Sequence, residues 1–267
     1  MKNKLYCGDC LEILPSIPSS SIDLILCDLP YGTSIVHKWN KILPLENLWI
    51  EYERVIKPNG VICLFGTQPF TSQLICSNIE LYRYMWLWKK ETPTGFLNAN
   101  YKPLNAIEEI AVFSKAKVGS LSKNPIPYHP PTLKAVEKKK SNKSNNTWRN
   151  AMGYKSDKNK LNSGMEYVQK FTNYPTTILE YAREEKQIHP TQKPTELLEF
   201  LIRTYTDEND VVLDNCMGSG STGVACVKTK RRFIGIEKEP QFYDIARGRI
   251  EEAANKKALN VVECAVM

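Results

Sequence analysis

Asp28-Leu29-Pro30-Tyr31 is a short motif that could hold the exocyclic amino group of a nucleobase. Such an amine is a poor nucleophile because its lone pair is delocalised into the ring. The Asp28 carboxylate and the Leu29 carbonyl could accept its two N–H bonds and direct the lone pair at an electrophilic methyl group. Pro30 stiffens the loop, and Tyr31 offers an aromatic face to a base removed from its stack. The alternative is a tight turn at a strand end, for which these residue types and Gly32 are common.

A second motif, at residues 214–222, could hold a nucleoside-containing cofactor on its backbone. It reads D-N-C-M-G-S-G-S-T, and its two glycines let the chain turn sharply and approach a ligand closely. A helix that begins near Ser221 would offer unpaired N–H groups and a positive dipole end to a carboxylate. Glu237 follows Asp214 by 23 residues, where an acidic residue typically binds ribose hydroxyls. The run does not match G-x-x-x-x-G-K-[ST], which disfavours ATP phosphates.

Alternating strands and helices must position both motifs. Short apolar runs predict strands at residues 21–27, 61–65, 84–89, 107–114, 211–213 and 233–236, of which the first is the first strand of the chain. Apolar residues at helical spacing predict helices at 45–56, 72–79, 195–205 and 242–256, besides the one near Ser221. Lys57-Pro58-Asn59-Gly60 is typical of a helix stop. The alternation predicts an α/β fold, a doubly wound and mostly parallel sheet with helices on both faces.

The positive charge of the chain lies in one central segment. Residues 115–186 hold 15 Lys and Arg against 6 Asp and Glu, a balance of +9, whereas the rest of the chain holds 21 against 23, a balance of −2. Isolated aromatic residues interrupt this segment and no period is visible in it, so a solvated loop or a disordered stretch is one interpretation. Cations interleaved with aromatics also suit phosphate contact and base stacking, which favours a nucleic acid as the partner.

Composition argues against several other classes. No stretch is apolar for long enough to span a bilayer and no secretory signal opens the chain, so we expect no membrane partner and a cytoplasmic location. Most of the eight cysteines lie in apolar runs, which fits reduced thiols. Cys7 and Cys10 form a C-x-x-C pair, but the zinc interpretation needs a second pair that the chain lacks. We therefore expect no metal site.

The two motifs and their order resemble the DNA amino-methyltransferases of the permuted β group. Members of that family place the target-base motif first, then a target-recognition region, then the cofactor loop. The resemblance includes Tyr6 to Asp9, R-V-I-K-P-N-G-V at 54–61, F-G-T-Q-P-F at 65–70 and H-P-T-Q-K-P at 189–194. It implies a Rossmann-like fold with a target-base half at residues 1–114, a target-recognition region at 115–187 and a cofactor-binding half at 188–267.

The family resemblance also implies S-adenosylmethionine as the cofactor and indicates the residues that would hold it. Its methionine end would lie against Asp214, Gly218, Gly220, Ser221 and Thr222. Glu237 would bind its ribose, and Asp9 would contact its adenine side. His189 and Lys193 would approach its carboxylate, although a loop histidine also has purely structural uses.

Two positions depart from the family pattern. Leu29 stands where proline is usual, but only a backbone carbonyl is needed there. Asn215-Cys216 stand where Pro-Phe is usual, and the phenylalanine of that pair packs near the cofactor. The residue that opens the target-base motif follows the family, in which aspartate usually accompanies adenine and serine usually cytosine. Asp28 therefore favours N6 of adenine as the methylated atom, with N4 of cytosine as the alternative.

Other classes of protein share part of these features. A nicotinamide-dependent oxidoreductase would share the glycine loop and the acidic residue, but not the D-L-P-Y motif or the basic segment. A binding module without catalysis would explain the basic segment only. A methyltransferase acting on RNA or on protein would share a similar motif, and the identity of the methyl acceptor discriminates among these. The permuted order and the basic segment favour duplex DNA, and the family resemblance makes a homodimer plausible.

Overall fold

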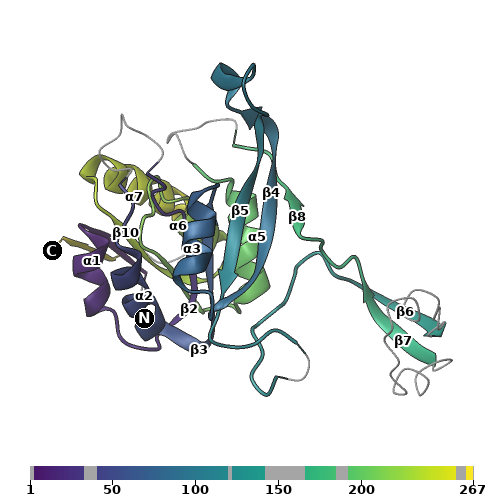
Figure 1. Ribbon diagram of the computed structural model, residues 1–267. Helices are drawn as coiled ribbons and strands as arrows, with labels where there is room; N and C mark the ends of the chain where they lie inside the picture. The colour runs from purple at the N-terminus through teal and green to yellow at the C-terminus, as the bar shows by residue number, and fades with distance from the viewer. Residues whose placement is uncertain are drawn as a thin grey trace. The chain divides into compact units, whose positions relative to one another are not determined.

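One large sheet forms the centre of the larger of two units, which comprises Met1–Pro131 and Thr176–Met267 (Figure 1). The computed structural model describes residues 3–32, 41–119, 122–141, 166–184, 192–256 and 263–266. The strands of the sheet are β1 (Lys4–Cys7), β2 (Ile22–Cys27), β3 (Ile56–Gly66), β4 (Tyr82–Thr94), β5 (Asn105–Phe113), β8 (Ile178–Glu180), β9 (Val211–Asp214), β10 (Arg232–Glu237) and β11 (Glu263–Val266). Their order is β11-β1-β10-β9-β2-β3-β5-β4-β8, and among these described strands β5 alone runs antiparallel to its neighbours.

Helices cover both faces of this sheet. They are α1 (Cys10–Ile13), α2 (Leu45–Val55), α3 (Phe70–Ser77), α5 (Thr195–Tyr205), α6 (Ser221–Thr229) and α7 (Pro240–Asn255), with short 3-10 helices at Leu14–Ser16 and Phe96–Asn98. Side chains of β2 alternate between two apolar cores: Leu24 and Leu26 pack with α5, α6 and α7, whereas Ile25 and Cys27 pack with α1, α2 and α3. The predicted α/β fold with a doubly wound, mostly parallel sheet is therefore confirmed.

One prediction about this unit was wrong, and one strand begins earlier than predicted. The first strand of the chain is β1, which is only four residues long and pairs with β10 and β11, so its sequence shows no usable period. Helix α2 ends at Val55, just before Lys57-Pro58-Asn59-Gly60, as the predicted helix stop requires, but these four residues already belong to β3, which was predicted only from Val61. The register against β2 slips there, from Ile22–Ile56 to Leu24–Val61, and such a bulge accommodates a proline.

The strand order creates a crevice between β2 and β9. These neighbours are parallel, with Leu24 opposite Val212 and Ile25 opposite Leu213. The chain leaves β9 through α6 toward β10 on one side, and leaves β2 through α2 toward β3 on the other. Ligands bind α/β sheets at such a switch point, outside the carboxyl ends of the strands. Both sequence motifs begin there, because Asp28 follows β2 and Asp214 ends β9.

The second unit, Thr132–Pro175, lies within the predicted target-recognition region. Its described part is an antiparallel hairpin of β6 (Lys134–Ser141) and β7 (Glu166–Thr172), whose side chains are mostly exposed. Lys138 and Lys140 share one face of β6, while Lys139 points to the other, because successive strand residues alternate. The segments on either side of the hairpin belong to the larger unit, where Ile126 and Leu179 join the core. Among all described residues, no helix is long and apolar enough to cross a membrane.

Candidate active site

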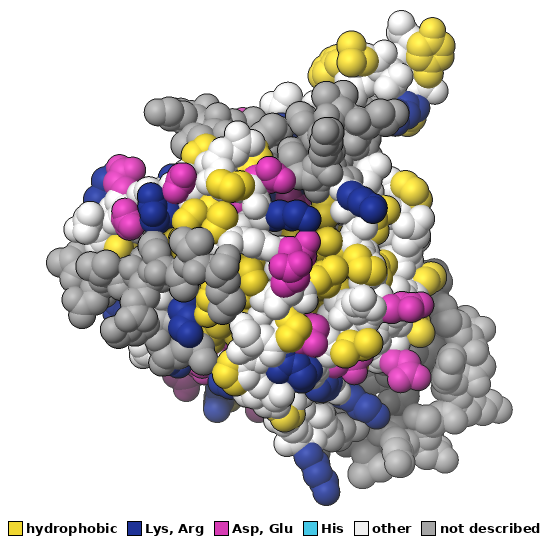
Figure 2. All heavy atoms as spheres, turned by 90° about the vertical axis from the view of Figure 1, so that its left-hand side faces the viewer, with side chains coloured by type: hydrophobic (Ala, Val, Ile, Leu, Met, Phe, Trp, Pro, Cys, Tyr) yellow, Lys and Arg dark blue, Asp and Glu magenta, His cyan; other side chains and the backbone are white. Residues whose placement is uncertain are grey.

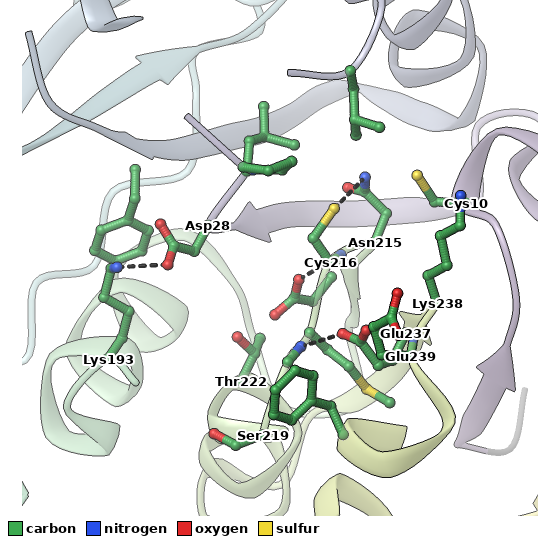
Figure 3. Close-up of a pocket in the computed structure, with 18 of the residues that line it drawn as sticks. Cys10, Asp28, Lys193, Asn215, Cys216, Ser219, Thr222, Glu237, Lys238 and Glu239 are labelled. Carbon is green, nitrogen blue, oxygen red and sulfur yellow. Dashed lines mark hydrogen bonds and ion pairs between the residues drawn. The ribbon is translucent and has the colours of Figure 1, made fainter. Parts of the chain in front are cut away.

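A cavity of about 580 Å³ opens at the carboxyl ends of β2, β9 and β10, at the crevice that the strand order creates. The predicted site residues that line it are Asp9, Asp28, Leu29, Pro30, Tyr31, Lys193, Asp214, Gly218, Ser221, Thr222 and Glu237. Figure 3 shows that Asp28 and Lys193 lie at one end of it, and Glu237, Lys238 and Glu239 at the other. The structure thus brings the two motifs, almost 190 residues apart in the sequence, to one cavity.

At the Glu237 end, backbone amides fix a buried carboxylate. The Gly218 N–H donates to Glu237 Oε2 at 2.7 Å, and the Glu239 N–H donates to Oε1 at 2.8 Å. Burial raises the pKa of Glu237, although these hydrogen bonds oppose the shift. Gly218 has a φ of 51°, which places its N–H toward β10 and leaves no side chain in the cavity. An oriented carboxylate of this kind can accept hydrogen bonds from ribose hydroxyls.

Asp214 ends β9 and lines the cavity. Its side chain is buried, and the Cys216 N–H donates to Asp214 Oδ1 at 3.2 Å. Burial raises its pKa to about 6, and a hydrogen bond with Thr222 of α6 opposes this rise. The N-terminus of α6 therefore approaches Asp214 through its own second residue, as the strand–loop–helix pattern predicts.

Asp9 lies at the outer part of the Glu237 end. Its Oδ1 accepts the Leu11 N–H at 3.0 Å and so caps α1, while Oδ2 lies 2.8 Å from Lys238 Nζ. The bond from Lys238 lowers the pKa of Asp9. A capping aspartate at the cavity rim is a fixed acceptor, which fits the predicted position near the adenine side of a cofactor.

One predicted cofactor residue, Gly220, is not among the described residues that line the cavity. Gly220 has a φ of 78° and faces α7, where a Cβ atom would come within 2.8 Å of Ala246 Cβ. A glycine is therefore required at position 220, both by the backbone conformation and by the close packing of α6 against α7. His189 lies outside the described residues, and its role stays a prediction.

At the other end of the cavity, Asp28 is engaged through both carboxylate oxygens. The Tyr31 hydroxyl donates to Oδ1, and Lys193 Nζ lies 2.6 Å from Oδ2. Burial raises the pKa of Asp28, against the opposing effects of Lys193 and Tyr31. Tyr31 packs beside Phe70 with ring centroids 5.2 Å apart, so α3 supports the ring from behind. The motif therefore places an acceptor group and an aromatic ring together at the cavity.

Sequence reasoning did not find two charged residues beside this end. Glu108 of β5 lies 3.3 Å from Lys193 Nζ, and Lys90 of β4 lies 3.3 Å from Glu108. The predicted role of Lys193 toward the cofactor stays a prediction, because the structure pairs its ammonium with Asp28 and Glu108. A signal for both missed residues exists: Lys90 continues the buried row of Trp86 and Trp88, and Glu108 shares the alternating register of Ile110 and Val112.

Arg249 of α7 is another residue that the sequence did not single out. Its guanidinium donates to the Ser219 carbonyl at 2.7 Å and to the Ser221 hydroxyl at 3.2 Å. The same group lies 3.3 Å from Glu184, which also accepts the Thr195 N–H at the start of α5. Arg249 therefore links α7 to the glycine-rich loop. No spacing in the sequence indicates this contact.

The pair Asn215-Cys216, which departs from the family pattern, is accommodated in different surroundings. Asn215 is buried and accepts the Tyr52 hydroxyl of α2 at 2.5 Å. Cys216 lines the cavity and packs against the same apolar core as Cys10. A side-chain hydrogen bond with Cys216 lowers the pKa of Cys10. Within the described residues, no group of three His, Cys, Asp or Glu side chains could hold a metal ion.

Comparison with known proteins agrees with this geometry. The family model described as DNA methylase matches residues 22–248. The type II methyltransferase M.HinfI of Haemophilus influenzae is 28% identical over 94% of this chain and 68% of its own length. The crystal structure of the M1.HpyAVI–SAM complex has 25% identity and a TM-score of 0.58, covering 92% of this chain and 98% of that one. The PvuII DNA methyltransferase, cytosine-N4-specific, shares the fold at 17% identity and a TM-score of 0.63, covering 98% and 95%.

Because the family model spans most of the sequence, the chain belongs to this family of DNA methylases. The resemblance stated from the two motifs and their order is therefore confirmed, and so is the expectation of an enzyme that methylates DNA.

Proposed function

We propose that this DNA methylase transfers a methyl group from S-adenosylmethionine to N6 of adenine in duplex DNA. The observation that carries the proposal is the single cavity that Asp28 shares with Gly218 and Glu237. One end offers an acceptor and an aromatic ring for a base, and the other offers an acidic acceptor and bare backbone for a nucleoside.

The cavity residues fit this methyl donor. The volume of about 580 Å³ is that of a small-molecule site, and the Glu237 carboxylate is oriented for hydroxyl groups by two backbone amides. The similar M1.HpyAVI was crystallised as a complex with SAM, which supports the same cofactor for this chain. When bound, the cofactor supplies an electrophilic methyl group. Asp214, Thr222 and Glu237 would hold it in the cavity, and Gly218 would leave room for it.

The residues of the target-base motif place the acceptor amine. Asp28 and the Leu29 carbonyl accept the two N–H bonds, which turns the nitrogen lone pair toward the methyl group. Tyr31 stacks on the base, which must leave the duplex to reach the cavity. Leu29 and Phe65, whose side chains are buried, add apolar walls to the cavity.

The choice of adenine rests on the aspartate that opens the motif. Adenine and cytosine both present two N–H donors, so the carboxylate alone does not select between them. N4 of cytosine is the second candidate. The PvuII DNA methyltransferase, which is cytosine-N4-specific, is similar to this chain in fold only, so it does not decide between the two bases.

Recognition of the DNA site is assigned to the basic segment 115–187, which includes the exposed β6–β7 hairpin and its three adjacent lysines. Exposed Tyr167 and Phe171 on β7 provide aromatic faces beside these cations. The homodimer and the cytoplasmic location expected from the sequence stay predictions.

The test is to incubate duplex DNA with the enzyme and methyl-deuterated S-adenosylmethionine, and to analyse the nucleosides by mass spectrometry. The expected product is deuterated N6-methyladenine, with duplex RNA and a protein mixture remaining unlabelled in parallel reactions. N4-methylcytosine without N6-methyladenine would overturn the base assignment, and label in RNA or protein alone would overturn the substrate class.

A further inference from the structure

A chain of four charged side chains extends from the target-base motif into the sheet. Asp28 Oδ2 lies 2.6 Å from Lys193 Nζ, Lys193 Nζ lies 3.3 Å from Glu108 Oε2, and Glu108 Oε1 lies 3.3 Å from Lys90 Nζ. Their side chains are 20%, 8%, 12% and 2% exposed in the same order, Asp28, Lys193, Glu108 and Lys90. The signs alternate, so the cluster is neutral although it lies mostly away from water. Its inner half, Glu108 and Lys90, has no part in the chemistry derived above.

The sheet fixes the inner half of this cluster. Glu108 stands on β5 opposite Trp88 of β4, and Lys90 follows two residues after that tryptophan. The Lys90 ammonium also contacts Thr94 Oγ1 at 3.2 Å. Both side chains are therefore anchored on paired strands, whereas Lys193 lies two residues before the start of α5.

Lys193 competes with the proposed substrate for Asp28. In the structure its ammonium occupies the oxygen Oδ2, while Tyr31 donates to Oδ1. A target amine that donates to this carboxylate must share or replace those contacts. A buried ammonium that loses its carboxylate without a replacement is strongly destabilised. The base can therefore engage Asp28 readily only if the Lys193 ammonium has another anion within reach.

We propose that Glu108 is the second position of the Lys193 ammonium: when the target amine engages Asp28, Lys193 shifts its ion pair to Glu108. Glu108 is thus a positioning residue that acts through Lys193 and sets how easily the base displaces it. Lys90 keeps Glu108 anionic for this purpose. The inference rests on the proposed role of Asp28 as acceptor of the target amine.

The charge states agree with this arrangement. Burial alone would raise the pKa of Glu108, but Lys193 and Lys90 together hold it below its ordinary value. Burial would lower the pKa of Lys193, but Asp28 and Glu108 raise it above its ordinary value. Burial raises the pKa of Asp28 and lowers that of Lys90, and in both cases the neighbouring group of opposite charge opposes the shift, so each pairing favours the charged forms.

The decisive variant is Glu108→Gln, which keeps the shape of the side chain and removes its charge. In this variant Asp28 is the remaining described carboxylate beside the Lys193 ammonium. The target base therefore displaces the ammonium from Asp28 with difficulty. We expect kcat/KM for DNA to fall about tenfold or more, because separating Lys193 from Asp28 then adds at least about 1.4 kcal/mol to the barrier. Affinity for S-adenosylmethionine, measured by calorimetry, is expected to stay unchanged, because Glu237 lies at the other end of the cavity.

A pH profile separates positioning from a structural role. In Glu108→Gln, Lys193 releases Asp28 most readily by losing its proton, so kcat/KM is expected to climb as the pH rises from about 7 to about 9. The wild-type profile is expected to be flat over the same range. Among the described residues, the charged and titratable groups that the structure places around Lys193 include Asp28, Tyr31, Glu108 and, beyond Glu108, Lys90, with Arg183 near Lys90.

A double variant tests the structural explanation directly. If Glu108→Gln failed only because it leaves Lys90 unpaired, then adding Lys90→Met would restore activity. The proposal predicts no rescue, because Lys193 still lacks its second position, and it predicts partial recovery in Glu108→Asp. Glu180→Gln is the matched control, since Glu180 pairs with Lys89 on the exposed side of β4.

The inference is supported if Glu108→Gln is slow, if its kcat/KM rises with pH, and if adding Lys90→Met does not restore activity. A wild-type rate and a flat profile in Glu108→Gln would overturn it, and so would rescue by Lys90→Met. These outcomes are distinct from failure of the proposed function, which would show as wild-type enzyme that methylates no adenine or as an Asp28→Ala variant of full activity.

Discussion

The carboxyl edge of the large sheet and the β6–β7 hairpin hold their charged side chains in opposite ways. At the edge, Asp28, Lys193, Glu108 and Lys90 alternate in sign and are largely buried. On β6, the run Lys138–Lys140 has one sign and is exposed. The face of the molecule in Figure 2 shows a third pattern, with Lys, Arg, Asp and Glu interspersed.

The difference follows from what each region has to do. Catalysis requires acceptors that keep one orientation, and paired charges in a low-dielectric site are held firmly. Phosphate contact requires only that cations reach the backbone of DNA through solvent. A two-stranded hairpin is marginally stable alone, so we expect the described part of the second unit to gain order when DNA binds.

The largest effect on the catalytic side is expected from Gly218→Asp. The new carboxylate would lie beside Glu237 and against the carboxylate of the cofactor, so binding of S-adenosylmethionine should be abolished. Calorimetry on the purified variant measures this. Unchanged affinity in a folded protein would show that the cofactor lies elsewhere.

Gly220→Ala is the matched control for that substitution. The added Cβ would meet Ala246 Cβ at 2.8 Å in a backbone of positive φ, so the variant should lose stability. Thermal unfolding should show a lower Tm for Gly220→Ala, whereas Gly218→Asp should act on cofactor affinity.

The next effect is a pH-dependent gain in stability from Asp214→Asn. The pKa of Asp214 rises to about 6 in the folded protein because the carboxyl is buried. A carboxyl that binds its proton more readily when folded lowers stability once ionised, so the penalty is complete above about pH 6 and absent below about pH 4. Removing it should raise the free energy of unfolding by up to about 3 kcal/mol at about pH 8.

Urea denaturation at both ends of that pH range checks this prediction. The Asn215 to Thr222 loop remains in place in the variant, because an asparagine oxygen still accepts the Cys216 N–H. An equal change in stability at about pH 4 and about pH 8 would assign the effect to packing and not to charge.

The smallest effect is expected on the recognition side. Lys138 and Lys140 lie on the same face of β6 as Tyr167, which stands opposite Lys140, so replacing both lysines with glutamine should remove two phosphate contacts. DNA affinity should weaken, and the slope of log affinity against log salt should drop by about 2. Lys139→Gln, on the opposite face beside Val168, should leave the slope nearly unchanged. Equal slopes in all three proteins would make this run a solvated surface.

Sequence patterns predicted the parts of the molecule that fold on local or short-range rules. Helix α5 occupies residues 195–205 as predicted, since its apolar spacing and its preceding proline define both ends. The glycine loop and the D-L-P-Y motif meet at one cavity because parallel strands align their carboxyl ends. In contrast, β1 is too short to show a period, and the β6–β7 hairpin carries its lysines without the alternation of a half-buried strand.

The partners of Lys193 were beyond sequence reasoning for a different reason. Glu108 lies 85 residues before Lys193, and only the pairing of β5 with β3 and β4 brings it to the cavity end. Arg249 reaches Ser219 through the packing of α7 in the same way. The available sign was a charged residue at a strand position whose neighbours two residues away are buried, as at Lys90 and Glu108.

The central claim is that the Asp28 end of the cavity accepts the target amine, and single-turnover methyl transfer in Asp28→Ala tests it most directly. Lys193 keeps its contact with Glu108 in this variant, so we expect a folded protein with unchanged affinity for S-adenosylmethionine. The rate of methyl transfer to duplex DNA should fall at least about 10²-fold, the scale for removing one positioned polar group. A variant that binds the cofactor and methylates DNA at the wild-type rate would contradict the account.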